Sequence, residues 1–104
     1  MNKDILSFPW FKFRIIEFYY NCSSEDYLEH YIEIGFKKEQ ELHKLRFEAP
    51  SLLEINEEFP HLTAGLIIDD ISDRQLENLN LSVDTFENSS RTISFLAKNV
   101  SKVF

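Results

Sequence analysis

Hydrophobic and polar residues alternate along most of the chain, which is the pattern of β-strands with one buried face. Between residues 8 and 20, aromatic and β-branched side chains occupy every second position, first on odd and then on even numbers: Phe11, Phe13, Ile15, Ile16, Phe18 and Tyr20. This composition favours strand. The parity changes at Ile15-Ile16, so we expect a β-bulge, or burial on both faces, at that point.

Residues 24–36 fit two structures. A strand would place four apolar side chains on one face, Leu28, Ile32, Ile34 and Phe36, and Tyr27, Glu29, Tyr31 and Glu33 on the other. A helix also fits, because several of the same residues recur with a period near 3.6, and Ser23 with Asp26 resembles a weak capping box. We favour the strand. After a charged break at 37–41, Leu45, Phe47 and Ala49 alternate with charged residues, which predicts the return strand of a hairpin ending at Pro50.

The second half of the chain predicts further short strands. Leu53 and Ile55 indicate a short extended piece, and residues 63–71 contain the apolar run of another strand. Ser72-x-x-Gln75 is a capping-box pattern, so we expect one helical turn over residues 73–78. Residues 79–87 and 91–100 alternate on either side of a polar turn, which predicts an antiparallel hairpin.

These elements predict one domain over residues 1–104 that is mainly β, or α+β. The expected architecture is an antiparallel sandwich or half-open barrel of about six or seven short strands with one short helical turn.

Charge is distributed unevenly along this expected fold. The chain carries 18 acidic and 11 basic residues, a formal net charge of −7. Residues 48–87 hold ten acidic residues and one basic residue, Arg74, whereas residues 88–104 hold three basic residues and no acidic one. A surplus of acids disfavours binding to nucleic acid or to an anionic membrane, and it suits a basic protein partner.

No pattern in the chain identifies a catalytic, metal or cofactor site. The histidines are isolated from one another in sequence: His30, His43 and His61. Cys22 is the single cysteine and has no base beside it, and the two glycines stand alone, so nucleophile, zinc and phosphate-loop motifs are missing. We therefore expect no cofactor, no metal and no enzymatic activity. The lone cysteine and the lack of a long apolar segment favour a cytoplasmic protein.

Several segments after residue 43 occur in an order similar to that of a known class of proteins. They are Lys44–Glu48, Phe59-Pro60, Leu66–Glu77, Val83–Glu87 and Ile93–Lys98. This half of the chain resembles small bacterial immunity proteins of polymorphic toxin and contact-dependent inhibition systems. The resemblance implies a cytoplasmic inhibitor of a cognate toxin domain, and basic nuclease domains are frequent among such toxins. It implies no fixed functional residues, because each such inhibitor is specific to its own toxin.

Charge and resemblance together favour stoichiometric binding of a basic, nuclease-like toxin domain through an acidic surface. The contact residues that we predict are eight acids and two tyrosines: Glu54, Glu57, Glu58, Asp69, Asp70, Asp73, Glu77, Asp84, Tyr27 and Tyr31. A small hydrolase or isomerase with paired carboxylates is the alternative, and an oligomerisation subunit is a third possibility. The sequence leaves the oligomeric state open.

Overall fold

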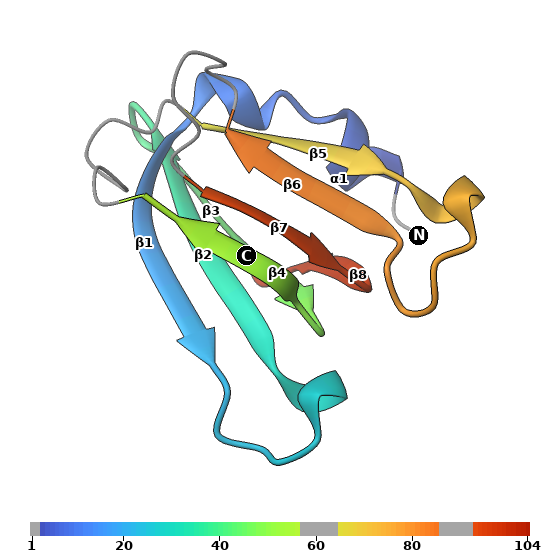
Figure 1. The fold of residues 1–104 in the computed structure, drawn as a ribbon. Coiled ribbons are helices and arrows are strands. Elements are labelled where there is room, and N and C mark those ends of the chain that lie inside the picture. Colours follow the sequence, from blue (N-terminus) through green and yellow to red (C-terminus); the bar gives the residue numbers. More distant parts are fainter. Residues whose placement is uncertain (1–2, 57–64, 86–92) are drawn as a thin grey trace.

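The structure is a computed structural model that describes residues 3–56, 65–85 and 93–104. Its strands form two four-stranded antiparallel sheets that pack face to face as a sandwich (Figure 1). The first sheet has the order β1 (Arg14–Asn21), β2 (Tyr31–Lys38), β3 (Glu41–Glu48) and β8 (Asn99–Lys102). The second has the order β4 (Ser51–Ile55), β7 (Ile93–Ala97), β6 (Leu81–Thr85) and β5 (Leu66–Asp70). This confirms the predicted mainly β sandwich, and the sheets do not close into a barrel.

The alternation of apolar residues determines which face of each sheet is buried. Ile32, Ile34 and Phe36 of β2 are fully buried, as the strand interpretation predicts, and Ile93 and Phe95 of β7 are buried opposite them. The residues of both sheets form one core cluster. Phe47 of β3 and Phe95 of β7 meet across the sandwich with ring centroids 5.2 Å apart, at nearly a right angle. The outer faces of the two sheets consequently point away from each other.

The chain passes from one sheet to the other at two neighbouring points. Ala49 and Pro50 connect β3 to β4, and Lys98 alone connects β7 to β8. The N–H of Lys98 donates to the carbonyl of Glu48 over 2.8 Å, so the two crossings are hydrogen-bonded to each other. Ala49 is buried with a φ of 51°, a left-handed conformation that turns the chain sharply. The predicted hairpin between residues 79–87 and 91–100 is confirmed for β6 and β7, but residues 99–102 belong to the other sheet.

The predicted strand over residues 8–20 is wrong in its first half. Residues Lys3–Ser7 form a helix (α1), and Trp10–Lys12 form a 3-10 turn (η1) that follows Pro9. A period of three residues per turn places Trp10 and Phe13 on the same side, where both are buried. The Trp10 indole N–H donates to the carbonyl of Ile5 over 2.7 Å, which ties η1 to α1. The bulge predicted at Ile15-Ile16 is confirmed, because the pairing of β1 with β2 shifts there.

Two other local predictions need correction. Leu28 does not belong to a strand face: Tyr27–Glu29 form a 3-10 turn (η2), and β2 begins only at Tyr31. The side chain of Asp26 caps this turn by accepting from the N–H of Leu28. The capping box at Ser72 does not form either. Ser72–Arg74 make a single 3-10 turn (η3), which Gln75 ends with a φ of 56°.

Among the described residues, no helix is long and apolar enough to cross a membrane. The predicted Thr63-Ala64 start of a strand and the predicted polar turn at 87–91 lie outside the described residues.

Candidate functional site

The outer face of the β4-β7-β6-β5 sheet gathers three of the predicted contact acids. Glu54 pairs with Ser94, Ser94 with Asp84, and Asp84 with Ile67, so these four residues form one row across the sheet. The next row contains Asp69 beside Ser82. Asp84 and Asp69 each follow a buried residue of the core, Val83 and Ile68, and Glu54 follows the partly buried Leu53, so the three acids point outward.

No lysine or arginine occurs in the described strands β4, β5, β6 and β7. The described basic residues nearest to these strands in sequence are Arg74, in the connection after β5, and Lys98, in the crossing after β7. The four strands themselves therefore contribute acidic but no basic side chains. We call this surface, made of the outward residues of β4 to β7, the acidic face.

A shallow groove of about 180 Å³ runs over the acidic face. Its lining combines acidic, hydroxyl and apolar side chains, among them Leu52, Glu54, Ser82, Asp84, Ser94 and Leu96. Leu52 is 74% exposed and has a φ of 55°, within the irregular pairing between Ser51 and Glu54. A branched apolar residue in this conformation is strained, and such strain is more frequent at binding sites than elsewhere. No local sequence pattern indicates Leu52, because the irregular pairing depends on contacts with β7.

Three other predicted acids lie at the end of the sheet, in and before the β5–β6 connection. Asp73 is in η3, and Glu77 follows it; both are exposed. Asp70, at the end of β5, has a structural role: its carboxylate accepts from the backbone N–H of Ser72 over 2.8 Å. Hydrogen bonds from the Ser72 side chain and backbone lower the pKa of Asp70. Asp70 therefore orders the start of the connection. Glu57 and Glu58 lie outside the described residues.

The two predicted tyrosines lie away from the acidic face. Tyr27 is in η2, in the connection between β1 and β2, and Tyr31 is on the outer face of the β1-β2-β3-β8 sheet. The ten predicted contact residues thus do not form one surface. The acidic face brings together Glu54, Asp69 and Asp84.

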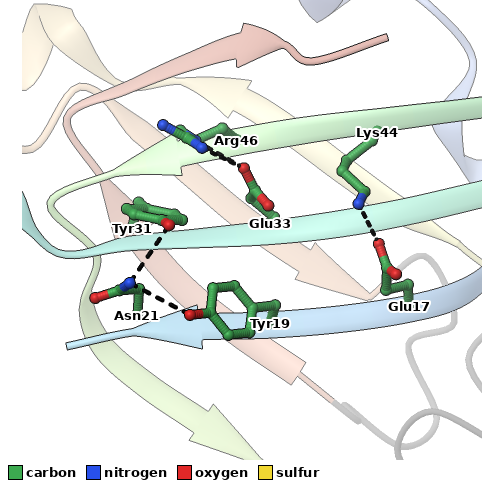
Figure 2. A network of polar contacts seen from close by, with 7 residues as sticks. All are labelled: Glu17, Tyr19, Asn21, Tyr31, Glu33, Lys44 and Arg46. Carbon is green, nitrogen blue, oxygen red and sulfur yellow. Dashed lines mark hydrogen bonds and ion pairs between the residues drawn. The ribbon is translucent and has the colours of Figure 1, made fainter. Parts of the chain in front are cut away.

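The outer face of the β1-β2-β3-β8 sheet is a network of paired polar side chains (Figure 2). Arg46 contacts Glu33 at 2.6 Å, and its guanidinium lies 4.1 Å from the ring centroid of Tyr31. Asn21 donates to the hydroxyls of Tyr19 and Tyr31 over 3.3 and 3.4 Å. On this surface, Arg46 and Glu33 are paired within the chain.

Glycine at position 35 allows a second ion pair in this network. Lys44 of β3 contacts Glu17 of β1 at 2.6 Å, although β2 lies between them. The residue of β2 in the same row is Gly35, over which Glu17 reaches (Figure 2). A Cβ atom there would lie 3.0 Å from the Cβ of Glu17. The hydrogen bond that Lys44 donates to Glu17 raises the pKa of Lys44, and the hydrogen bond that Arg46 donates to Glu33 raises the pKa of Arg46.

The described residues contain no group of three or more His, Cys, Asp or Glu side chains that could hold a metal ion. His43 is enclosed by the rings of Phe8, Trp10 and Phe13 at 5.2 to 5.4 Å, and its Nε2 contacts Glu41 at 2.5 Å. Cys22 is exposed in the β1–β2 connection. These groups lie in different parts of the fold and do not converge on a cleft that the structure describes.

In comparisons with known proteins, no family model, curated protein or solved structure matches this chain significantly.

Proposed function

We propose that the chain is an immunity protein that binds a cognate toxin domain through the acidic face and thereby neutralises it. The observation that carries this proposal is the placement of Glu54, Asp69 and Asp84 on one sheet face whose strands contribute no basic residue. The resemblance of residues 44–98 to immunity proteins supports it independently, and so does the formal charge of −7. The partner that fits is a basic, nuclease-like domain of a toxin.

The acidic face suits such a partner for an electrostatic reason. Neighbouring strands lie about 4.8 Å apart, so Glu54 and Asp84, two strands apart, hold their backbones roughly 10 Å from each other. A row of carboxylates at this spacing presents repeated negative charge, as a nucleic acid backbone does, to lysine and arginine side chains of a nuclease. The small Ser94 between the two acids leaves room for an incoming cation.

Leu52 and Leu96 supply the apolar part of the interface. Both line the groove beside Glu54 and Asp84, so the methylene chain of a bound lysine or arginine would contact them while its charged end reaches the carboxylates. An apolar contact surrounded by charges is the usual arrangement of a tight interface, because it removes water from the charge pairs. This combination predicts both a fast association and a slow dissociation.

The test is protection by charge-reversed variants. A triple variant, Glu54→Lys, Asp69→Lys and Asp84→Lys, is co-expressed with the toxin domain encoded beside this gene, and growth is measured. We expect protection to be lost and the dissociation constant of the purified complex to rise by at least about 100-fold, because removing a paired interfacial charge costs about 2–5 kcal/mol.

The matched control reverses three exposed acids elsewhere: Glu25→Lys, Glu29→Lys and Glu39→Lys. These residues lie in the β1–β2 connection and the β2–β3 turn, and their reversal changes the net charge by the same amount. We expect this variant to protect like the wild type. Equal protection by both variants would mean that the acidic face is not the surface that binds the toxin domain. Loss of protection in both would mean that only the net charge of the chain matters.

A further inference from the structure

Exposed apolar side chains gather on the outer face of the β1-β2-β3-β8 sheet, beside the polar network. Four of them are between 45% and 58% exposed: Ile16, Leu42, Val103 and Phe104. Tyr19, on the same face, is 50% exposed. Nearly half of the large apolar side chains that are exposed in the described chain therefore lie on one sheet face. Exposed apolar residues scattered singly need no explanation, whereas several on one sheet face make that face a candidate binding surface.

Two irregular pairings place three of these residues there. Ile16 is the extra residue of the β1 bulge, and its Cγ1 would lie 3.7 Å from a Cβ atom at Gly35, which shows that it projects over the outer face. At the other edge, the N–H groups of Val103 and Phe104 both approach the carbonyl of Lys44, at 2.7 and 3.4 Å. The Lys44 ammonium lies 5.5 Å from the Phe104 ring centroid, so this ring is also on the outer side. Apolar groups thus lie at both edges, on β1 and after β8.

The charges of the same face are divided between its two halves. In the two central rows, the acids are on β1 and β2, as Glu17 and Glu33, and the bases are on β3, as Lys44 and Arg46. Each acid is paired with a base within the chain, and the four side chains remain between 14% exposed, for Glu33, and 51% exposed, for Glu17. One half of the face is therefore negative in these rows, and the other half is positive.

We propose that this face binds the same face of a second copy of the chain, around a two-fold axis parallel to the strands. Such an axis places β1 over β8 and β2 over β3 of the partner. Glu33 of one copy then faces Arg46 of the other, twice, and Ile16 faces Val103 and Phe104, also twice. The same two-fold rotation therefore brings opposite charges together and apolar side chains together, as an interface between two identical surfaces requires. Aligned packing of two sheets is also a common arrangement.

The size of the face indicates a weak dimer. Three strands of eight residues and β8 of four, at about 4.8 Å spacing and about 3.3 Å rise, give roughly 450 Å² per copy, or about 900 Å² in total. This is near the lower limit for a specific interface, and we expect a dissociation constant on the order of 10–100 μM. The acidic face lies on the opposite side of the sandwich and stays free, so the dimer does not depend on the proposed function and would bind two toxin domains.

Sedimentation equilibrium of the whole chain, up to about 1 mM, tests this inference. Ile16→Ser and Phe104→Ser each replace an apolar contact, and we expect each to weaken self-association by at least about tenfold. The control is Leu52→Ser, which removes the most exposed apolar side chain of the acidic face and leaves self-association unchanged. A wild-type chain that remains monomeric over the whole range overturns the proposal, and so does a dimer that only Leu52→Ser disrupts.

Charge exchange tests the two-fold arrangement itself. Glu33→Arg and Arg46→Glu each place like charges opposite each other in a homodimer, so each variant alone is expected to be monomeric. Their mixture restores opposite charges at both contacts, and we expect a heterodimer with affinity near that of the wild type. The intrachain pair is lost in both variants and does not return on mixing, so recovery reports only the contact between copies. Variants that dimerise alone, or a mixture that stays monomeric, contradict the arrangement.

Discussion

Replacing Gly65 by alanine tests the account of how the N-terminal segment is held against the sandwich. Gly65 precedes β5 and has a φ of 145°, a conformation that residues with a side chain rarely adopt. A Cβ atom there would lie 2.6 Å from the carbonyl oxygen of Trp10 and 2.7 Å from that of Phe13. Both of these oxygens belong to the backbone, and the Trp10 carbonyl is held in place because it accepts from the Phe13 N–H. The variant must therefore move η1 or β5.

The expected loss of stability has two parts. The backbone conformation costs about 1–3 kcal/mol for a residue other than glycine. Overpacking against fixed atoms costs about 1–3 kcal/mol more. We therefore expect Gly65→Ala to lower the free energy of unfolding by about 2–6 kcal/mol, a large fraction of the about 5–15 kcal/mol typical of a domain. Since 1 kcal/mol corresponds to about 4–8 °C for a domain of this size, the midpoint of thermal unfolding should fall by at least about 10 °C.

Urea unfolding measured by the fluorescence of Trp10 is the direct assay. Trp10 is the single tryptophan and is buried in η1, so it reports on the segment that the variant displaces. The matched control is Gly35→Ala, whose new Cβ atom meets a side chain, Glu17, rather than backbone. We expect the control to cost about 1 kcal/mol or less, because the Glu17 side chain can shift away from the new Cβ atom, and a surface ion pair such as Glu17–Lys44 contributes little to stability. If Gly65→Ala were as stable as the control, the close contact between Gly65 and η1 would not be what holds the segment.

Three further predictions concern stability and pH. Asp70→Ala removes the carboxylate that accepts from the Ser72 N–H. Because the pKa of Asp70 is lowered in the folded state, its contribution to stability is present above the unfolded-state pKa of about 3.9 and is lost as pH falls through the folded-state pKa. Urea titrations of the variant and the wild type should therefore differ at pH 7 and converge in acid. Leu52→Gly relieves the strain of a left-handed conformation at an exposed site. Chemical unfolding should show a free energy of unfolding equal to that of the wild type or up to about 1 kcal/mol higher, while toxin binding is weakened. A large loss of stability would contradict this prediction. Trp10→Phe removes the indole N–H that donates to the Ile5 carbonyl. Thermal unfolding of this variant, followed by circular dichroism, should show a lowered midpoint that corresponds to a loss of about 1–3 kcal/mol. An unchanged midpoint would mean that this hydrogen bond does not stabilise the fold.

Much of the fold was predictable because period-two alternation is a local property. It identified the buried positions of β2 and β7 and the hairpin of β6 with β7. The same alternation misassigned residues 10–13, because the two aromatic residues three positions apart satisfy a 3-10 turn as well as a strand. The transfer of residues 99–102 to the other sheet was not predictable. No glycine or proline marks a break within residues 93–100, and the change of sheet depends on the hydrogen bond from the Lys98 N–H to the distant Glu48 carbonyl.

The candidate site was predictable only in part, for the same physical reason. The outward orientation of Glu54, Asp69 and Asp84 follows from the alternation within each strand. Their grouping depends on the strand order β4-β7-β6-β5, which pairs segments distant in sequence. The apolar residues of the other sheet face, such as Ile16 and Phe104, are brought outward by irregular pairing, which alternation does not indicate.

The most direct test of the central claim is the affinity of the purified chain for its toxin domain, measured with the acidic face intact and reversed. We expect each chain to bind one toxin domain, and we expect this complex to weaken by at least about 100-fold when Glu54, Asp69 and Asp84 become lysines but not when Glu25, Glu29 and Glu39 do. An affinity that is the same for all three proteins would contradict it.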